Sequence, residues 1–234
     1  MKILALDCSA GPASVAVLED GKIIASSFVN VKLTHSQTLL PMVESTLASA
    51  RLSVSDIDAL AINNGPGSFP GIRIGISAVK GIAAPTKKPC VPVSTLLSVA
   101  YGFLNNDCII CAVMDARCNQ VYNALFRVKD KKVERLCEDR AVSVDEVQKE
   151  LKELAAPVII AGDGAGLFQK FSEETEDISI AAEPIRYQNA TGVALAAEDY
   201  LRENKPLLDS ELMPFYLRLP QAERELKAKS LKGE

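Results

Sequence analysis

Residues 65–75, GPGSFPGIRIG, decide the fold of this chain, because four glycines and two prolines in eleven residues specify a backbone path rather than a packing surface. The run before them, residues 57–62, is short and mostly apolar and predicts a buried strand. After them, apolar residues recur at helical spacing, at Ile72, Ile76, Val79 and Ala83. The stretch therefore predicts a strand, a rigid loop and a helix over about 71–84.

The glycines and prolines of this loop also restrict the start of the helix. Gly67 and Gly71 permit backbone angles that other residues resist, and Pro66 and Pro70 disfavour an earlier helical turn. Such a loop can hold phosphate at a helix N-terminus, but a Walker motif ends in Gly-Lys-Ser/Thr, and the nearest lysine here is Lys80. The sequence therefore excludes a Walker-type nucleotide hydrolase.

Composition and length indicate a soluble, cytoplasmic protein with two lobes. The 234 residues are 48% hydrophobic and 24% charged, and no apolar run approaches the roughly 18 residues of a membrane span. Residues 1–6 are too short for a signal peptide, so we expect the six cysteines to be free thiols in a reducing compartment. The net charge of −4 lacks the basic excess of a protein that binds nucleic acid alone.

The predicted elements repeat their order once along the chain. The first set has strands at about 3–7, 14–18 and 23–29, a helix at 33–50, the strand and helix around the glycine loop, and a strand at 90–93 before a helix capped by Ser94 or Thr95. The second set has strands at about 108–114, 121–128 and 133–137, a helix at 143–154, a strand at 158–161 and a short helix after a glycine loop. A helix at 190–203 follows. The pattern predicts an α/β fold with a duplicated βββαβα unit, and lobes at 1–104 and 105–234.

This layout resembles the actin, sugar kinase and Hsp70 class, the ribonuclease H-like ASKHA fold, in which phosphate lies between one hairpin of each lobe. The candidate nucleotide-binding residues here are Asp7 and Ser9 in the first lobe, Asp115 in the second, and Gly162 and Asp163 beside a nucleoside. Either turn aspartate could instead accept hydrogen bonds from backbone amides of its own turn, which is a common role.

Four motifs together resemble the TsaB family, formerly called YeaZ: GPGSFPGIRIG at 65–75, MDAR at 114–117, AGDGA at 161–165 and YLRLPQAER at 216–224. The resemblance implies a part in placing a threonylcarbamoyl group on the adenosine beside the anticodon of ANN-decoding tRNAs. In that family the subunit is non-catalytic; it binds and stabilises the paralogue TsaD, with TsaE as an associated ATPase. The family pattern usually has threonine where this chain has Pro70.

The remaining motifs give no catalytic or metal site. His35 is the only histidine, and Leu39 stands where a second histidine would complete a metal pair on one helix face. Cys108 and Cys111 have CxxC spacing, but residues three apart on a strand face opposite sides, so we expect core thiols. We therefore expect no intrinsic metal or cofactor, with ATP or ADP bound only weakly or in a complex. The alternative is an independent enzyme of the same fold, a glycoprotease-like peptidase or a small-molecule kinase.

The helices at 34–50 and 71–84 are apolar over more than one face and predict a partner interface. Its candidate residues are Leu39, Val43, Leu47, Ile72, Ile76 and Val79. Two such helices from each of two related lobes can form a four-helix bundle, so we expect a homodimer in the absence of TsaD and competition between the two assemblies. We expect tRNA to reach this chain only through the complex, and the basic end with Lys227, Lys229 and Lys232 to be a solvated tail.

Overall fold

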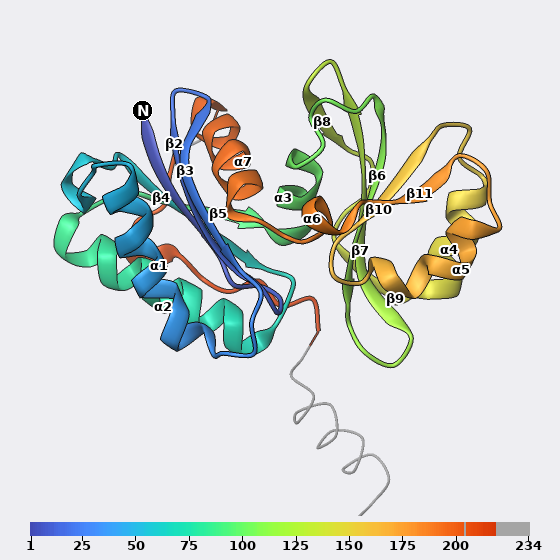
Figure 1. Cartoon of the computed structure of the whole chain (residues 1–234), viewed down its shortest axis with the longest axis horizontal. Coiled ribbons are helices and arrows are strands. Elements are labelled where there is room, and N and C mark those ends of the chain that lie inside the picture. The colour runs from blue at the N-terminus through green and yellow to red at the C-terminus, as the bar shows by residue number, and fades with distance from the viewer. Residues whose placement is uncertain (204, 219–234) are drawn as a thin grey trace, which may run out of the picture.

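The computed structural model describes residues 1–203 and 205–218 and contains two sheets with helices packed on both (Figure 1). The first sheet has the order β3-β2-β1-β4-β5, with β1 antiparallel to β2 and parallel to β4. Its strands are β1 (Lys2–Asp7), β2 (Ala13–Glu19), β3 (Lys22–Val29), β4 (Ala59–Gly65) and β5 (Cys90–Ser94).

The second sheet repeats this arrangement. Its order is β11-β10-β6-β7-β8, and β9 also pairs with β7. Its strands are β6 (Cys108–Asp115), β7 (Gln120–Lys129), β8 (Lys132–Arg135), β9 (Arg140–Ser143), β10 (Val158–Ala161) and β11 (Ile178–Ile180). The duplicated α/β fold expected from the sequence is confirmed, while β9 and β11 were not predicted.

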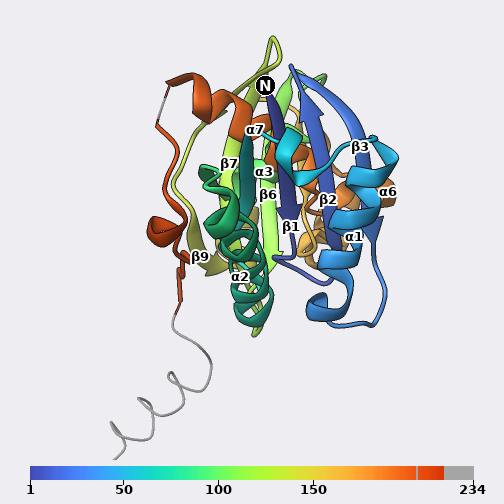
Figure 2. The ribbon, with the colours of Figure 1, turned by 90° about the vertical axis from the view of Figure 1, so that its left-hand side faces the viewer.

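Helices cover both faces of the first sheet. On one face lie α1 (His35–Ser49) and α2 (Phe69–Thr86), and on the other lies α7 (Ala190–Glu203). Figure 2 looks at the molecule from the side of α1 and α2, with the strands behind them. The alternation of strand side chains supplies both cores: Leu4 and Leu6 pack under α1 and α2, whereas Ile3 and Ala5 pack against α7.

The short helix α3 (Thr95–Tyr101) joins the two sheets. Its side chains share one buried cluster with Ile110 and Ala112 of β6 and Phe126 of β7. The second sheet's other face carries α4 (Val144–Lys152), α5 (Gln169–Glu173) and the turn η2 (Ala165–Phe168). The remaining elements are η1 (Val54–Asp56), α6 (Glu183–Arg186) and η3 (Asp209–Glu211). Because α3 is packed on both sides, the lobes meet through a core rather than through a linker.

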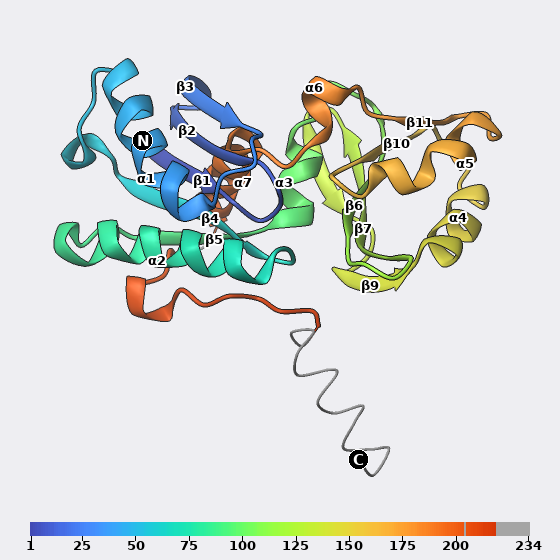
Figure 3. The same cartoon turned by 60° about the horizontal axis from the view of Figure 1, so that its bottom comes forward.

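The chain returns to the first lobe at its end. Leu207 exchanges two backbone hydrogen bonds of 2.8 Å with Cys90 at the edge of the first sheet, and Leu212 is fully buried in the core under α2. Figure 3 shows this segment running beside α2. The lobe boundaries at 1–104 and 105–234 stay a prediction, while the packing places α7 and this returning segment on the first sheet. The tail lysines 227, 229 and 232, and most of the YLRLPQAER motif, lie outside the described residues.

The decisive stretch forms the expected strand, loop and helix, with two corrections of their bounds. Strand β4 spans Ala59–Gly65, where 57–62 was predicted. Helix α2 begins at Phe69, with Ser68 as its N-cap, two residues before the predicted start. Pro70 lies in the first turn, where a missing N–H removes no helical hydrogen bond, so it does not delay the helix. Gly71 has an ordinary helical φ; a Cβ there would collide with the carbonyl oxygen of Cys8. Its role is therefore close packing of α2 on the end of β1.

Candidate functional site

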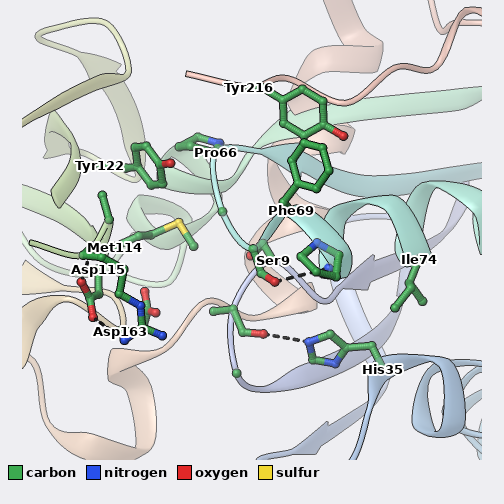
Figure 4. A pocket seen from close by; sticks show the side chains of 18 of the residues that line it. Ser9, His35, Pro66, Phe69, Ile74, Met114, Asp115, Tyr122, Asp163 and Tyr216 are labelled. Atoms are coloured by element: carbon green, nitrogen blue, oxygen red, sulfur yellow. Dashed lines mark hydrogen bonds and ion pairs between the residues drawn. The ribbon is translucent and has the colours of Figure 1, made fainter. Parts of the chain in front are cut away.

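A cleft of about 870 Å³ lies between the two lobes. Its walls include the β1–β2 turn, residues 30–35 at the start of α1, the glycine loop before α2, the β6–β7 turn and the segment 215–218 (Figure 4). Arg218 Nη1 donates a 3.1 Å hydrogen bond to the carbonyl of Ala116, so the end of the described chain joins the first lobe to the second across this cleft. The cleft therefore gathers the sequence motifs of both lobes.

Asp7 lies beneath the cleft rather than on its surface. Its Oδ1 accepts hydrogen bonds from the Ser9 amide at 3.0 Å and from Asn63 Nδ2 at 2.9 Å. Burial raises the pKa of the Asp7 carboxyl, and hydrogen bonds from Ser9 and Asn63 oppose that rise. Asp7 is 1% exposed, so its observed role is to hold its own turn and to brace β4.

Asp115 likewise binds its own turn. Its Oδ1 accepts from the Arg117 amide at 2.7 Å, and its Oδ2 pairs with the exposed Arg117 guanidinium at 3.4 Å. Residues 117–119 all have positive φ, which turns the chain sharply between β6 and β7. Asp115 and Arg117 both line the cleft.

Asp163 enters the cleft from the end of β10. Gly162 before it has a φ of 113°, and a Cβ there would collide with the carbonyl of Val113, so only glycine fits. Gln188 Nε2 donates to Asp163 Oδ1 at 2.8 Å. Burial raises the pKa of Asp163 to about 6, with a further contribution from the nearby charge of Asp115.

Of the five candidate nucleotide residues, the structure places Ser9, Asp115 and Asp163 in the lining of the cleft, Ser9 being almost fully buried there, and leaves Asp7 and Gly162 out of it. Ser9 Oγ is buried and has no hydrogen-bond partner among the described residues. Nucleotide contact at these residues stays a prediction.

His35 is a structural residue of the cleft wall. Its Nε2–H donates to the carbonyl of Ala10 at 2.8 Å, which ties the start of α1 to the β1–β2 turn. Within the described ranges, no group of three histidine, cysteine or acidic side chains is placed to hold a metal ion. Cys108 and Cys111 lie on β6, where burial raises the pKa of both thiols.

The predicted partner-interface residues require a correction. Leu39, Val43, Leu47, Ile72, Ile76 and Val79 are all 5% exposed or less and belong to the core between the two helices and the first sheet. The apolar stripe that the sequence shows is the face that each helix turns toward its own sheet. Of these six side chains only Leu39 also lines a surface groove, so the other five are not available to a partner in the folded chain.

The same helices form a different apolar surface, a groove of about 430 Å³ between α1 and α2. Its lining is His35, Ser36, Leu39, Leu40, Arg73, Ile74, Ser77 and Ala78. Leu40 is 48% exposed and Leu39 forms the floor. Helix periodicity alone did not separate Leu40 from its buried neighbours.

An aromatic pair beside the groove was also missed. Phe69 at the start of α2 stacks on Tyr216 with ring centroids 4.6 Å apart (Figure 4). The two residues are far apart in sequence, so the pair appears only once the chain end has returned to α2. Tyr216 is the first residue of the YLRLPQAER motif, and that motif is the sequence signal that could have pointed to this pair.

Comparison with known proteins gives consistent results. Residues 28–226 match the protein-family model described as TsaD, tRNA N6-adenosine threonylcarbamoyltransferase. The chain is 30% identical to the tRNA threonylcarbamoyladenosine biosynthesis protein TsaB of Bacillus subtilis, covering 95% of this chain and 96% of that protein. It is 31% identical to the protein of the same name from Escherichia coli, covering 98% and 100%. It is also 31% identical to the tRNA N6-adenosine threonylcarbamoyltransferase of Kosmotoga olearia, but over 44% of this chain and 36% of that protein.

Solved structures agree with the sequence matches. YeaZ from Pseudomonas aeruginosa superposes with a TM-score of 0.78 at 27% identity, covering 92% of this chain and 99% of that one. A ROK hexokinase from Thermus thermophilus superposes with a TM-score of 0.50 at 12% identity, covering 87% and 100%. The hexokinase likeness shows the fold alone.

Proposed function

This chain belongs to the TsaB family of tRNA threonylcarbamoyladenosine biosynthesis proteins, and we propose that it is the non-catalytic subunit of that pathway, which docks and stabilises a TsaD-type paralogue. The observation that carries this proposal is the groove between α1 and α2, which exposes Leu40 beside Ile74 and Ala78. An apolar groove of this kind on a soluble protein is typical of a docking surface.

The paralogue suits this groove because it is related in sequence to part of this chain. The 117-residue match to a tRNA N6-adenosine threonylcarbamoyltransferase indicates a shared structural unit in the two proteins. Two helices from each of two related lobes can pack as a four-helix bundle. A second copy of this chain offers the same pair of helices, so we propose that a homodimer forms without TsaD and competes with it.

The polar groups of the cleft support a role without catalysis. Asp115 is bound to its own turn and to Arg117, Asp163 accepts from Gln188, and His35 donates to a backbone carbonyl. These three side chains, each able to transfer a proton, are therefore engaged in holding the fold. We propose that ATP or ADP is bound weakly or only in the complex, that TsaE joins the complex, and that tRNA reaches this subunit only there.

The location follows from the pathway. Among the helices that the structure describes, none is long and apolar enough to cross a membrane. We propose a cytoplasmic protein.

The test compares two leucines of similar exposure. Leu40 in the groove is 48% exposed, and Leu167 on the turn η2 of the second lobe is 45% exposed. Leu40→Glu should weaken capture of TsaD from the same organism by more than tenfold, because a carboxylate replaces an apolar contact worth about 1.5–3 kcal/mol. Leu167→Glu should bind as the unmodified chain does, and circular dichroism checks that both variants fold.

Activity gives the second readout. Threonylcarbamoylation of tRNA should require TsaD, and Leu40→Glu should lower the reconstituted rate at limiting subunit concentration. Turnover by this chain alone, or equal capture by both leucine variants, contradicts the scaffold role.

A further inference from the structure

Among the described residues that line the groove, Arg73 is the one lysine or arginine. It lies one turn into α2 and is exposed. Its guanidinium carbon sits 3.8 Å from the ring centroid of Phe69, and its Nε donates to Tyr216 Oη at 2.9 Å. Three contacts on one flat group fix the orientation of the guanidinium: the Phe69 face, the Tyr216 hydroxyl and, at 5.8 Å, the Tyr216 ring.

The outer edge of this guanidinium carries two nitrogens, Nη1 and Nη2, that have no hydrogen-bond or ion-pair partner in the described part of the chain. Every other groove-lining side chain is apolar, a hydroxyl or the imidazole, and none is acidic. Helix α2 itself contains no aspartate or glutamate. The groove therefore presents a positioned positive fork next to apolar surface, with nothing of opposite charge in it.

A planar guanidinium fork pairs with a carboxylate through two parallel hydrogen bonds, and less side-chain entropy is lost when the fork is already held. Arginine anchors of this kind beside apolar pockets are frequent binding hot spots. We propose that Arg73 recognises a carboxylate on the helix that docks in the α1–α2 groove, and that this carboxylate belongs to the TsaD-type paralogue. The inference rests on the proposed docking function and adds the residue that selects the partner.

Charge favours the paralogue over a second copy. The only acidic residue on α1 and α2 is Glu44, which does not line the groove. A second copy would bring its own Arg73 to the contact and has a single carboxylate on these helices to offset it. Selection by Arg73 thus explains how the same apolar groove can bind the paralogue in preference to a second copy of this chain.

Tyr216 is a positioning residue for Arg73. It meets Arg73 from the returning chain end and accepts from Nε, which leaves Nη1 and Nη2 without a partner among the described residues. Tyr216→Phe keeps the stack on Phe69 and removes only the hydroxyl acceptor, so it should have a smaller effect than loss of the guanidinium.

The experiment measures the dissociation constant for TsaD by calorimetry at two salt concentrations, with the full chain. Arg73→Ala should weaken binding at least tenfold and flatten the salt dependence, because a charge pair is lost. Arg73→Lys should recover only part of the affinity, since an ammonium has no fork. Lys80→Ala is the matched control: it removes one positive charge from the same helix, outside the groove lining.

The outcomes separate this inference from the docking function. If Leu40→Glu weakens capture and folded Arg73→Ala binds as tightly as Lys80→Ala, docking stands and the role of Arg73 is wrong. If neither change weakens capture, the docking function fails as well. If Arg73→Ala and Glu44→Gln both abolish self-association while TsaD binding is unchanged, the carboxylate comes from a second copy and the proposal is overturned.

Discussion

Asn63 Nδ2 donates a 2.9 Å hydrogen bond to Asp7 Oδ1 in a space where both side chains are 1% exposed. The bond joins the end of β1 to the adjacent strand β4, just ahead of the glycine loop. Asp7 Oδ2, Asn63 Oδ1 and Ser9 Oγ have no partner in the described part of the chain. This site therefore holds a buried carboxylate with one unsatisfied oxygen. It also holds two further buried oxygen atoms, of Asn63 and Ser9, that could accept a hydrogen bond.

Replacing that carboxylate with an amide should stabilise the fold. Asp7→Asn keeps an oxygen to accept from Ser9 and Asn63, and its new N–H group can donate to an unpartnered oxygen. Burial raises the pKa of Asp7, so the charged form opposes folding above the unfolded pKa near 3.8. We expect a gain of about 1–3 kcal/mol at pH 7, from relief of an unsatisfied buried group.

The gain should shrink as pH falls toward 4, because protonation then neutralises Asp7 in the unmodified chain too. Urea unfolding at pH 4.5 and 7 measures it. A loss of stability at pH 7 in the variant would mean that the Asp7 charge is used in the fold.

Asp163 predicts a second pH dependence in the free energy of unfolding. Its folded pKa of about 6 exceeds the unfolded value of 3.8. Its contribution is therefore fully present below about pH 4 and is lost as pH rises through 6. We expect the unmodified chain to lose on the order of 2–3 kcal/mol over this interval relative to Asp163→Asn. Parallel stability profiles for the two proteins between pH 4 and 7 would contradict the raised pKa.

Two glycines of α2 predict opposite effects of one substitution. A Cβ on Gly75 would lie 2.5 Å from Cys8 Sγ and 2.9 Å from Ile62 Cδ1, whereas nothing lies within 4 Å of a Cβ on Gly81. Gly75→Ala should cost about 1–3 kcal/mol through overpacking. Gly81→Ala should gain about 0.5–1 kcal/mol from helix propensity. Thermal unfolding of both variants measures the difference, and equal shifts would show that the thiol moves aside freely.

The sequence predicted the elements around residues 65–75 well because their signals are local. A short stretch of sequence is enough to predict each of three elements: the strand before the loop, the helix after it and the helix at 190–203. The strands β9 and β11 are only four and three residues long, too short to show a periodicity. Their existence depends on pairing with β7 and β10.

The candidate site was predicted less completely, for a different physical reason. A turn aspartate such as Asp115 is visible in sequence, but its partner, the amide of its own turn or a ligand, is decided by geometry. Periodicity shows that a helix has an apolar face, but it does not show what that face packs against. In α1 and α2 the apolar face packs on their own sheet. The exposure of Leu40 in the folded chain distinguishes it from its buried apolar neighbours on α1. The Arg73–Tyr216 contact joins residues that are 143 apart in the sequence, so no local pattern predicts it.

Nucleotide binding by the isolated chain should be weak. The carboxylates of Asp115 and Asp163 both reach the cleft, and at pH 7.5 Asp163 is above its pKa of about 6 and is ionised. Both carboxylates oppose the phosphates of ATP. Of the lysines and arginines that line the cleft, Arg117 is paired with Asp115 and Arg218 donates to the carbonyl of Ala116, which leaves Lys32 to attract the phosphates. Calorimetry with ATP and magnesium should give a dissociation constant weaker than 1 mM, about −4 kcal/mol. A micromolar constant would show that Ser9 and the loop amides outweigh this repulsion.

Two substitutions only two residues apart on α2 should distinguish the role of its groove-lining face from that of its core face. Val79 is fully buried under the first sheet, so Val79→Glu should lose the cooperative fold because it buries an unpaired charge. Ser77 is exposed and lines the groove one helical turn after Arg73, so Ser77→Glu should fold normally. Its carboxylate lies four residues from Arg73 and can pair with the open fork, as oppositely charged residues at this helical spacing do.

Ser77→Glu should therefore block docking in two ways: it occupies Arg73 from within the chain and places a charge in an apolar groove. We expect TsaD capture to fall at least tenfold with no loss in unfolding temperature. In the Arg73→Ala background the added loss from Ser77→Glu should be smaller, since there is no fork left to occupy. A folded Ser77→Glu variant with unchanged capture would place the partner surface outside the α1–α2 groove.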